Sequence, residues 1–230
     1  MKKYSLIILF LLCINSSLSQ LFTIDYKSNF EKATNFYSEK QAFFKHIICD
    51  KYKLDAQELF SIVAPEVAFY FDLQDFAETS TLQLFYTELG SDYANFSIGL
   101  FQMKPSFVER LEYCVIQNSN LQQYRFIADF PEKDIKKIRS VRLERLQSIT
   151  WQTYYLCTFY SYMEERYGNK EFASTVEKLC FYATAYNRGF ECDEKEIERW
   201  LKIKHFPATF QKDKFAYADV VKEFYVYLKK

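Results

Sequence analysis

The sequence predicts an all-α (mostly α) protein. Three features lead to this prediction: aromatic residues make up 20% of the 230 residues, glycine and proline occur only four times each, and strand periodicity is nearly absent. No long polar tract interrupts the chain, which argues against disorder. A mature chain of roughly 210 residues suits a single domain with a substantial core.

The first residues have the pattern of a secretory signal peptide. A basic start is followed by an apolar run over residues 4–14 and by Ser17 and Ser19, which form a small-x-small cleavage pattern. We therefore expect a signal peptide over 1–19 and an exported, periplasmic or secreted domain over 20–230. The apolar run is too short to span a bilayer, so no integral membrane segment is expected after cleavage.

The helices of the first half follow from apolar spacing and from end signals. A helical stripe covers residues 28–50. Asp55 is expected to be the N-cap of a second helix, which Pro65 kinks or ends, and this places Glu66 at a helix terminus. A third helix is expected over Thr79–Leu89, because a glycine follows in the usual position after a helix end.

The second half begins with Pro105, which suits the first turn of a helix reaching about Gln117. The stretch 118–131 is irregular. A basic run in the next helix is interpreted as a solvated helix face rather than an anion site; its members are Lys136, Lys137, Arg139, Arg142 and Arg145. Further helices are expected over Glu132–Tyr167, with a break near Gln147, and over Phe172–Tyr186, Asp193–Leu201 and Tyr217–Leu228.

These helices also predict an arrangement. The Asp55–Pro65 helix is apolar on most sides, so it should be central and surrounded by the helices Ser106–Gln117 and Phe172–Tyr186. Glu66 would then lie at the C-terminal end of the central helix. There the negative end of the helix dipole would oppose ionisation of the carboxyl.

The cysteines leave alternatives open. Acylation of Cys13 would make a lipoprotein, but Leu11 and Leu12 are not the small residues that usually precede such a cysteine. Export would permit disulfides, yet five remaining cysteines allow many pairings, and several are expected simply to pack in the core. The five are Cys49, Cys114, Cys157, Cys180 and Cys192.

Charge and histidine content disfavour two classes of site. Basic and acidic residues number 30 each, which gives no support for nucleic-acid binding, since that needs a clustered basic face. His46 and His205 are far apart and no Cys-x-x-Cys occurs, so no metal site and no cofactor are expected. The sequence does not identify a protein partner, so protein partners stay unknown at this point.

Glu66 is the candidate catalytic acid. It stands between Ile62-Val63-Ala64-Pro65 and Val67-Ala68-Phe69-Tyr70, an apolar segment. A carboxyl held partly in an apolar pocket has a raised pKa, because burial disfavours the charged form, and it can donate a proton near neutral pH. The alternative is a carboxylate that pairs with a basic side chain or points into solvent.

Two later motifs complete the pattern. Gly99-Leu100-Phe101-Gln102, followed by Pro105, reads as a turn whose glycine lets the backbone approach a sugar and whose Gln102 can bind hydroxyl or acetamido groups. Ala185-Tyr186-Asn187-Arg188-Gly189 ends a helix with an aromatic residue, an amide and a glycine. The alternatives are an ordinary loop and an ordinary helix end.

The ordered triplet resembles the soluble lytic transglycosylase family of the lysozyme-like superfamily, whose members cut the glycan strands of peptidoglycan. The resemblance spans about 55–190. It implies a lysozyme-like domain, Glu66 as the single acid/base, and a substrate subsite built from Gly99, Leu100, Phe101 and Gln102. It further implies that Tyr186 bonds near the acid and the N-acetyl group, and that Asn187 fixes the local backbone.

By this resemblance the chain would be a lyase, acting on the β-1,4 bond between N-acetylmuramic acid and N-acetylglucosamine with a 1,6-anhydro product. Departures keep two alternatives: a catalytically inactive lysozyme-like protein that binds glycan or a partner, and a hydrolytic lysozyme. Val67 replaces the family's serine, Phe96 and Ser97 replace Gly-Ala, and the Thr79–Leu89 helix is additional. Hydrolysis needs a second carboxylate, for which Asp72, Asp75, Glu78, Asp92 and Glu109 are candidates.

Overall fold

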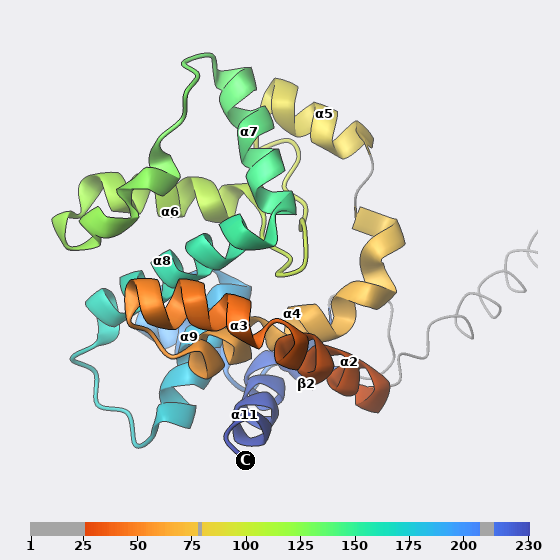
Figure 1. The fold of residues 1–230 in the computed structure, drawn as a ribbon, viewed down its shortest axis with the longest axis vertical. Helices are drawn as coiled ribbons and strands as arrows, with labels where there is room; N and C mark the ends of the chain where they lie inside the picture. Colours follow the sequence, from red (N-terminus) through yellow and green to blue (C-terminus); the bar gives the residue numbers. More distant parts are fainter. Residues whose placement is uncertain (1–25, 78–79, 208–213) are drawn as a thin grey trace, which may run out of the picture.

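The structure, a computed structural model, describes residues 26–77, 80–207 and 214–230, and the side chains of this part except at 71–77 and 80. The expected signal peptide, with Cys13, lies outside the described residues. The described chain is mostly helical, which confirms the all-α class (Figure 1). Its elements are α2 (Tyr26–Glu39), α3 (Gln41–Phe44), the π-helix η1 (Lys45–Lys51), α4 (Ala56–Ala77), α5 (Ser80–Leu89), α6 (Pro105–Gln117), the 3₁₀-helix η2 (Ser119–Ala128), α7 (Ile135–Gln147), α8 (Ile149–Tyr167), α9 (Thr175–Arg188), α10 (Glu194–Trp200), β1 (Lys204–Phe206), β2 (Phe215–Ala216) and α11 (Tyr217–Leu228).

Local end signals place most helix boundaries as expected. The Asp55 carboxylate accepts hydrogen bonds from the backbone N–H groups of Gln57 and Glu58, at 2.8 and 3.0 Å, and so caps α4. Gly90 follows α5 with a φ of +95°, a left-handed conformation that glycine adopts without strain. The predicted break in the long helix is confirmed at Ser148, between α7 and α8.

Helix α4 continues through Pro65, so the prediction that Glu66 lies at a helix terminus is wrong. Proline has no N–H to donate to the Ser61 carbonyl, and its ring crowds the preceding turn. The phenol of Tyr217 donates to the neighbouring carbonyl of Ile62 at 3.0 Å, which gives this turn a partner from outside the helix. Because residues 59–64 are buried on every side, packing holds the helix together across the proline.

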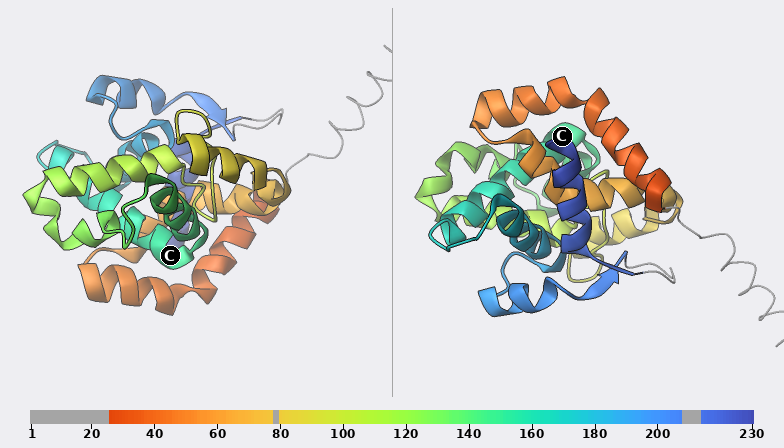
Figure 2. Two further views of the ribbon diagram at one scale, coloured as in Figure 1. Left: turned by 90° about the horizontal axis from the view of Figure 1, so that it is seen from above. Right: turned by 90° about the horizontal axis from the view of Figure 1, so that it is seen from below.

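The predicted centre of the fold is confirmed only in part. Helix α4 packs against α9, as expected, but its other main neighbours are α2 and α11 (Figure 2). Helix α6 packs instead on η2, α8 and α7, so its expected place around α4 is wrong. The reason is that the apolar face of α6, which includes Leu111, is covered by the chain segment that directly follows it.

The basic face of α7 is not a fully solvated one. Arg142 is buried and its guanidinium lies 2.7 Å from the Glu112 carboxylate. Arg145 is also buried and donates to the backbone carbonyls of Ile127 and Asp129, at 2.7 and 2.6 Å. The prediction is therefore wrong for these two arginines, since burial became favourable once hydrogen-bond acceptors were supplied by neighbouring elements.

Two further findings concern the described residues as a whole. None of their helices combines the length and the apolar character that crossing a membrane requires. The short antiparallel pair β1–β2 leads directly into α11 and so brings Tyr217 toward α4.

Candidate active site

A groove of about 440 Å³ lies where α4, the loop before α6, the first turns of α6, the end of α9 and the end of β1 meet. Glu66, Gln102, Tyr186 and Asn187 all line it. The structure thus brings one or more residues of each of the three motifs to one place, although the motifs are far apart in the sequence. Helix α5, which is additional to the pattern of the family that the motifs resemble, contributes no residue to the groove wall.

Glu66 is partly exposed to the groove, while protein atoms crowd its carboxyl. Burial raises the pKa of Glu66 to about 8. Hydrogen bonds to the side chains of Asn187 and Tyr217 and the charge of Lys104 act in the opposite direction but do not outweigh burial. The helix dipole has no part in this shift, because Glu66 lies within α4 rather than at its end.

Tyr217 is a site residue that the sequence did not point to. It is buried, and its phenol has one proton for two acceptors, the Ile62 carbonyl at 3.0 Å and the Glu66 carboxyl. Donation of this proton to Glu66 stabilises its ionised form and so lowers its pKa. Tyr217 is thus a hydrogen-bond partner of both the acid and the backbone of the helix that carries it.

The Gly99–Gln102 motif forms a tight reverse turn. Ile98 and Met103 exchange backbone hydrogen bonds of 2.9 and 3.1 Å across it, and the Gln102 amide donates to the Gly99 carbonyl at 2.8 Å. Gln102 itself has a φ of +50°, a conformation unusual outside glycine. The turn therefore presents the Gln102 side chain to the groove with its amide already oriented.

Gly99, Leu100 and Phe101 do not line the groove, so the prediction of a substrate subsite from them is not supported. A Cβ on Gly99 would lie 2.2 Å from the Gln152 amide nitrogen, so the glycine permits packing against α8 rather than approach to a sugar. The Phe101 ring is fully buried and stacks near Phe44, and Leu100 is partly buried against the core.

The turn is anchored by two side chains from other helices. The buried amide of Gln152 accepts from the Phe101 N–H at 3.0 Å and donates to the carbonyls of Ile98 and Leu146, at 2.8 and 2.7 Å. The Tyr186 phenol donates to the Phe101 carbonyl at 2.6 Å. Gln152 was not identified from the sequence as an anchor of the turn. The one feature that could have pointed to it is the presence of a glutamine within a largely aromatic helix. Tyr186 positions the turn, and its pKa is raised by burial and by nearby Glu66.

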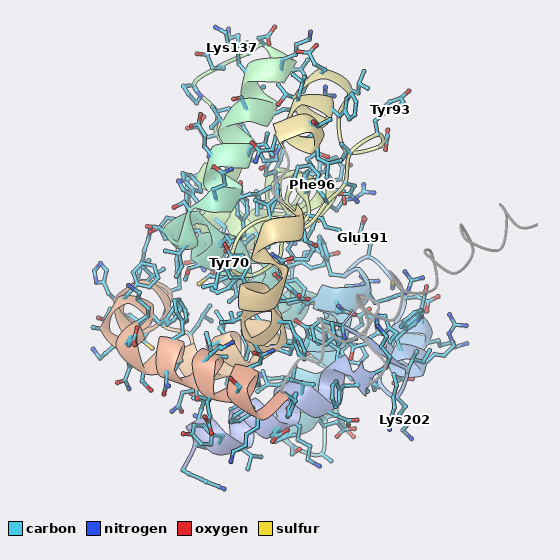
Figure 3. The ribbon with its side chains drawn as sticks, turned by 90° about the vertical axis from the view of Figure 1, so that its right-hand side faces the viewer. Tyr70, Tyr93, Phe96, Lys137, Glu191 and Lys202 are labelled. Carbon is cyan, nitrogen blue, oxygen red and sulfur yellow. The ribbon has the colours of Figure 1, made fainter. Side chains whose placement is uncertain are left out.

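Two of the five second-carboxylate candidates have described side chains, Asp92 and Glu109, and neither lines the groove. Asp92 is exposed elsewhere, and Glu109 accepts from Tyr86 and Ser91 at 2.8 and 2.6 Å. The side chains of the other three candidates lie outside the described part. Among the described side chains, the other carboxylate on the groove wall besides Glu66 is Glu191, which pairs with Arg110. Figure 3 labels Glu191 below Phe96.

Within the described ranges, no group of histidine, cysteine and acidic side chains could hold a metal ion. The five cysteines there are not bonded to one another, and Cys157 is fully buried. Comparisons with protein-family models, curated proteins and solved structures find no match to this chain. The likeness to soluble lytic transglycosylases thus rests on the three motifs and on the groove to which they contribute.

Proposed function

We propose that the chain is an exported lytic transglycosylase that cleaves the β-1,4 bond between N-acetylmuramic acid and N-acetylglucosamine in peptidoglycan. The observation that supports this proposal best is the convergence of Glu66 with Gln102 and Asn187 in one open groove. The raised pKa of Glu66, about 8, keeps its carboxyl largely protonated at neutral pH, as a general acid requires.

In this mechanism Glu66 donates its proton to the leaving glycosidic oxygen while the substrate's own N-acetyl oxygen attacks the anomeric carbon. The Glu66 carboxylate then accepts the proton of the 6-hydroxyl as that oxygen displaces the N-acetyl group and closes the anhydro ring. No water is consumed. The donors from Asn187 and Tyr217 stabilise the carboxylate between the two steps.

Two features of the groove bear on the alternatives. A catalytic acid must be reachable by the glycan, and α5 contributes no residue that closes the groove at Glu66. A hydrolase would need a second carboxylate, and the one on the wall, Glu191, lies 2.7 Å from Arg110. Because Arg110 already engages this carboxylate, single-acid chemistry fits the described part of the groove better.

The test is digestion of purified cell-wall sacculi. Glu66→Gln keeps the shape of the side chain and removes the proton donor, so we expect its rate to fall at least about 100-fold. Glu144→Gln, an exposed position on α7 away from the groove, is the control and should digest like the parent. Mass spectrometry of the products separates anhydro ends from the reducing ends of a hydrolase. An unchanged rate in Glu66→Gln would end the proposal.

A further inference from the structure

The groove has an excess of positive charge, although basic and acidic residues are equal in number in the whole chain. Lys104, Arg110 and Arg188 lie on its wall, against Glu66 and Glu191. Because the pKa of Glu66 is about 8, Glu191 is the main negative charge there at neutral pH. Such a wall favours a negatively charged ligand over a neutral one.

Arg110 and Glu191 show how a carboxylate sits in this groove. Arg110 projects from α6 and Glu191 follows α9, and the Arg110 Nε lies 2.7 Å from a Glu191 oxygen. This is the one polar contact of the Arg110 guanidinium within the described residues, so its two terminal nitrogens keep their donors. Each side chain is about half exposed, at 51% and 50%.

An ion pair so exposed contributes little to stability, and a competing carboxylate can replace one partner at small cost. The arginine fork binds carboxylates through two parallel N–H groups, which gives a bound ligand more than the single contact made by Glu191. Release of Glu191 would leave its side chain free to turn into solvent.

The other two cations differ in their engagement. Arg188 pairs with Glu196 at 2.6 Å and lies over the Trp200 ring, 4.9 Å from its centre. Lys104 is exposed on the groove wall and has no carboxylate within ion-pair distance among the described side chains. Lys104 is therefore available to support a second oxygen or a neighbouring anionic group.

We propose that Arg110, supported by Lys104, is a specificity-determining residue that binds a carboxylate of the glycan in place of Glu191. This inference rests on the proposed action on peptidoglycan. The carboxylate has two sources: the lactyl group of muramic acid, free where peptides have been removed, or the peptide itself. Oligomers of N-acetylglucosamine carry neither.

The experiment measures binding to Glu66→Gln protein, so that no ligand is cleaved. The probes are a muramic-acid-containing tetrasaccharide with its peptides, the same tetrasaccharide without them, and a neutral N-acetylglucosamine tetramer. Adding Arg110→Gln should weaken binding of at least one carboxylate probe by about tenfold or more, and should change binding of the neutral tetramer less than about twofold. The carboxylate probe that loses more identifies the source.

Two variants serve as controls. Arg199→Gln, an exposed arginine of α10 away from the groove, should change none of the three affinities. Glu191→Gln removes the resident competitor and should tighten binding of the carboxylate probes by a few-fold. If Arg110 only braced the wall, Arg110→Gln and Glu191→Gln would weaken all three probes alike, which overturns the inference.

Failure of the inference and failure of the proposed function give different results. If the parent digests sacculi but Arg110→Gln binds every probe as the parent does, only the role of Arg110 is wrong. If the parent does not digest sacculi and none of the three probes binds, both proposals are wrong. Should Arg110→Gln fail to fold, as judged by circular dichroism, Glu191→Gln decides: affinity unchanged for carboxylate probes overturns the inference.

Discussion

At the scale of single residues, Glu66 shows how one carboxyl is balanced between two protonation states. Burial favours the neutral acid, whereas the Asn187 amide, the Tyr217 phenol and the Lys104 charge favour the carboxylate. A general acid that later acts as a base needs both states to be reachable, and a pKa near the working pH provides this. The balance comes from side chains of α9, α11 and the loop before α6, not from the helix that carries Glu66.

The first prediction at this scale concerns pH. Activity should fall as pH rises through about 8, because ionised Glu66 cannot donate a proton. Tyr217→Phe removes a donor that lowers the pKa of Glu66, so this alkaline limit should move to higher pH, by about half a unit to one unit. The measurement is the pH profile of kcat/KM on soluble glycan.

Tyr186→Phe is the matched comparison for Tyr217→Phe. The phenol of Tyr186 donates to the Phe101 carbonyl rather than to Glu66, so its loss should lower the rate by loosening the turn and leave the alkaline limit in place. Equal displacement of the limit in both variants would contradict the assignment of Tyr217 as the partner of the acid.

At the scale of elements, the sequence predicts those helix ends that are determined by residues nearby in the chain. The Asp55 carboxylate caps the first turn of α4, Pro105 begins α6 with one unpaired N–H fewer, and Gly90 ends α5 in a left-handed conformation. The path of α4 through Pro65 could not be predicted in this way. It depends on Tyr217, which is 155 residues from Ile62 in the sequence, and on the burial of residues 59–64 by neighbouring elements.

The same division holds for the candidate site. Glu66, Gln102, Tyr186 and Asn187 were predictable because each motif is short and their order is informative. Gln152 was not, since its three hydrogen bonds go to backbone groups whose positions only the folded turn defines. The sequence also predicted that Gly99 faces a sugar, whereas it packs against Gln152 and Leu146 in the interior. The side on which a glycine lies depends on how the folded chain packs, and the motif does not contain that information.

Gly99→Ala is the prediction at the element scale. Its Cβ would lie 2.4 Å from the Leu146 carbonyl as well as against Gln152, at a φ of +66°, so strain and steric overlap add. We expect a loss of about 3 kcal/mol in the free energy of unfolding. Gly189→Ala has a positive φ of +129° but no atom closer than 3.9 Å, so it measures strain alone. Denaturant unfolding of both compares them, and equal losses would contradict the packing role.

At the scale of the whole molecule, a buried polar cluster joins elements on the side of α6 away from the groove. Arg142 of α7 donates to Glu112 of α6 and to the phenol of Tyr86 of α5, at 2.7 Å for the latter, and Tyr155 of α8 donates to Glu112 at 3.0 Å. Figure 1 shows α5 and α7 at one end of the molecule, where this cluster holds them to α6. Helix α6, which carries Arg110, is thus held to α7 and α8 by hydrogen bonds on the face opposite the groove.

Removing one member of this cluster should lower the free energy of unfolding of the protein. Arg142→Met leaves the Glu112 carboxylate buried without its cation, and we expect a loss of about 3–5 kcal/mol in the free energy of unfolding, measured by denaturant titration. Because a buried pair gains little over well-packed apolar groups, the double variant Arg142→Met/Glu112→Leu should recover much of that loss.

Lys137→Met, an exposed position on the same helix, is the control and should change stability by less than about 0.5 kcal/mol. If the single variant lost no more than this control, the cluster would not be what holds α5, α6 and α7 together, and the rigidity of the groove wall would need another cause.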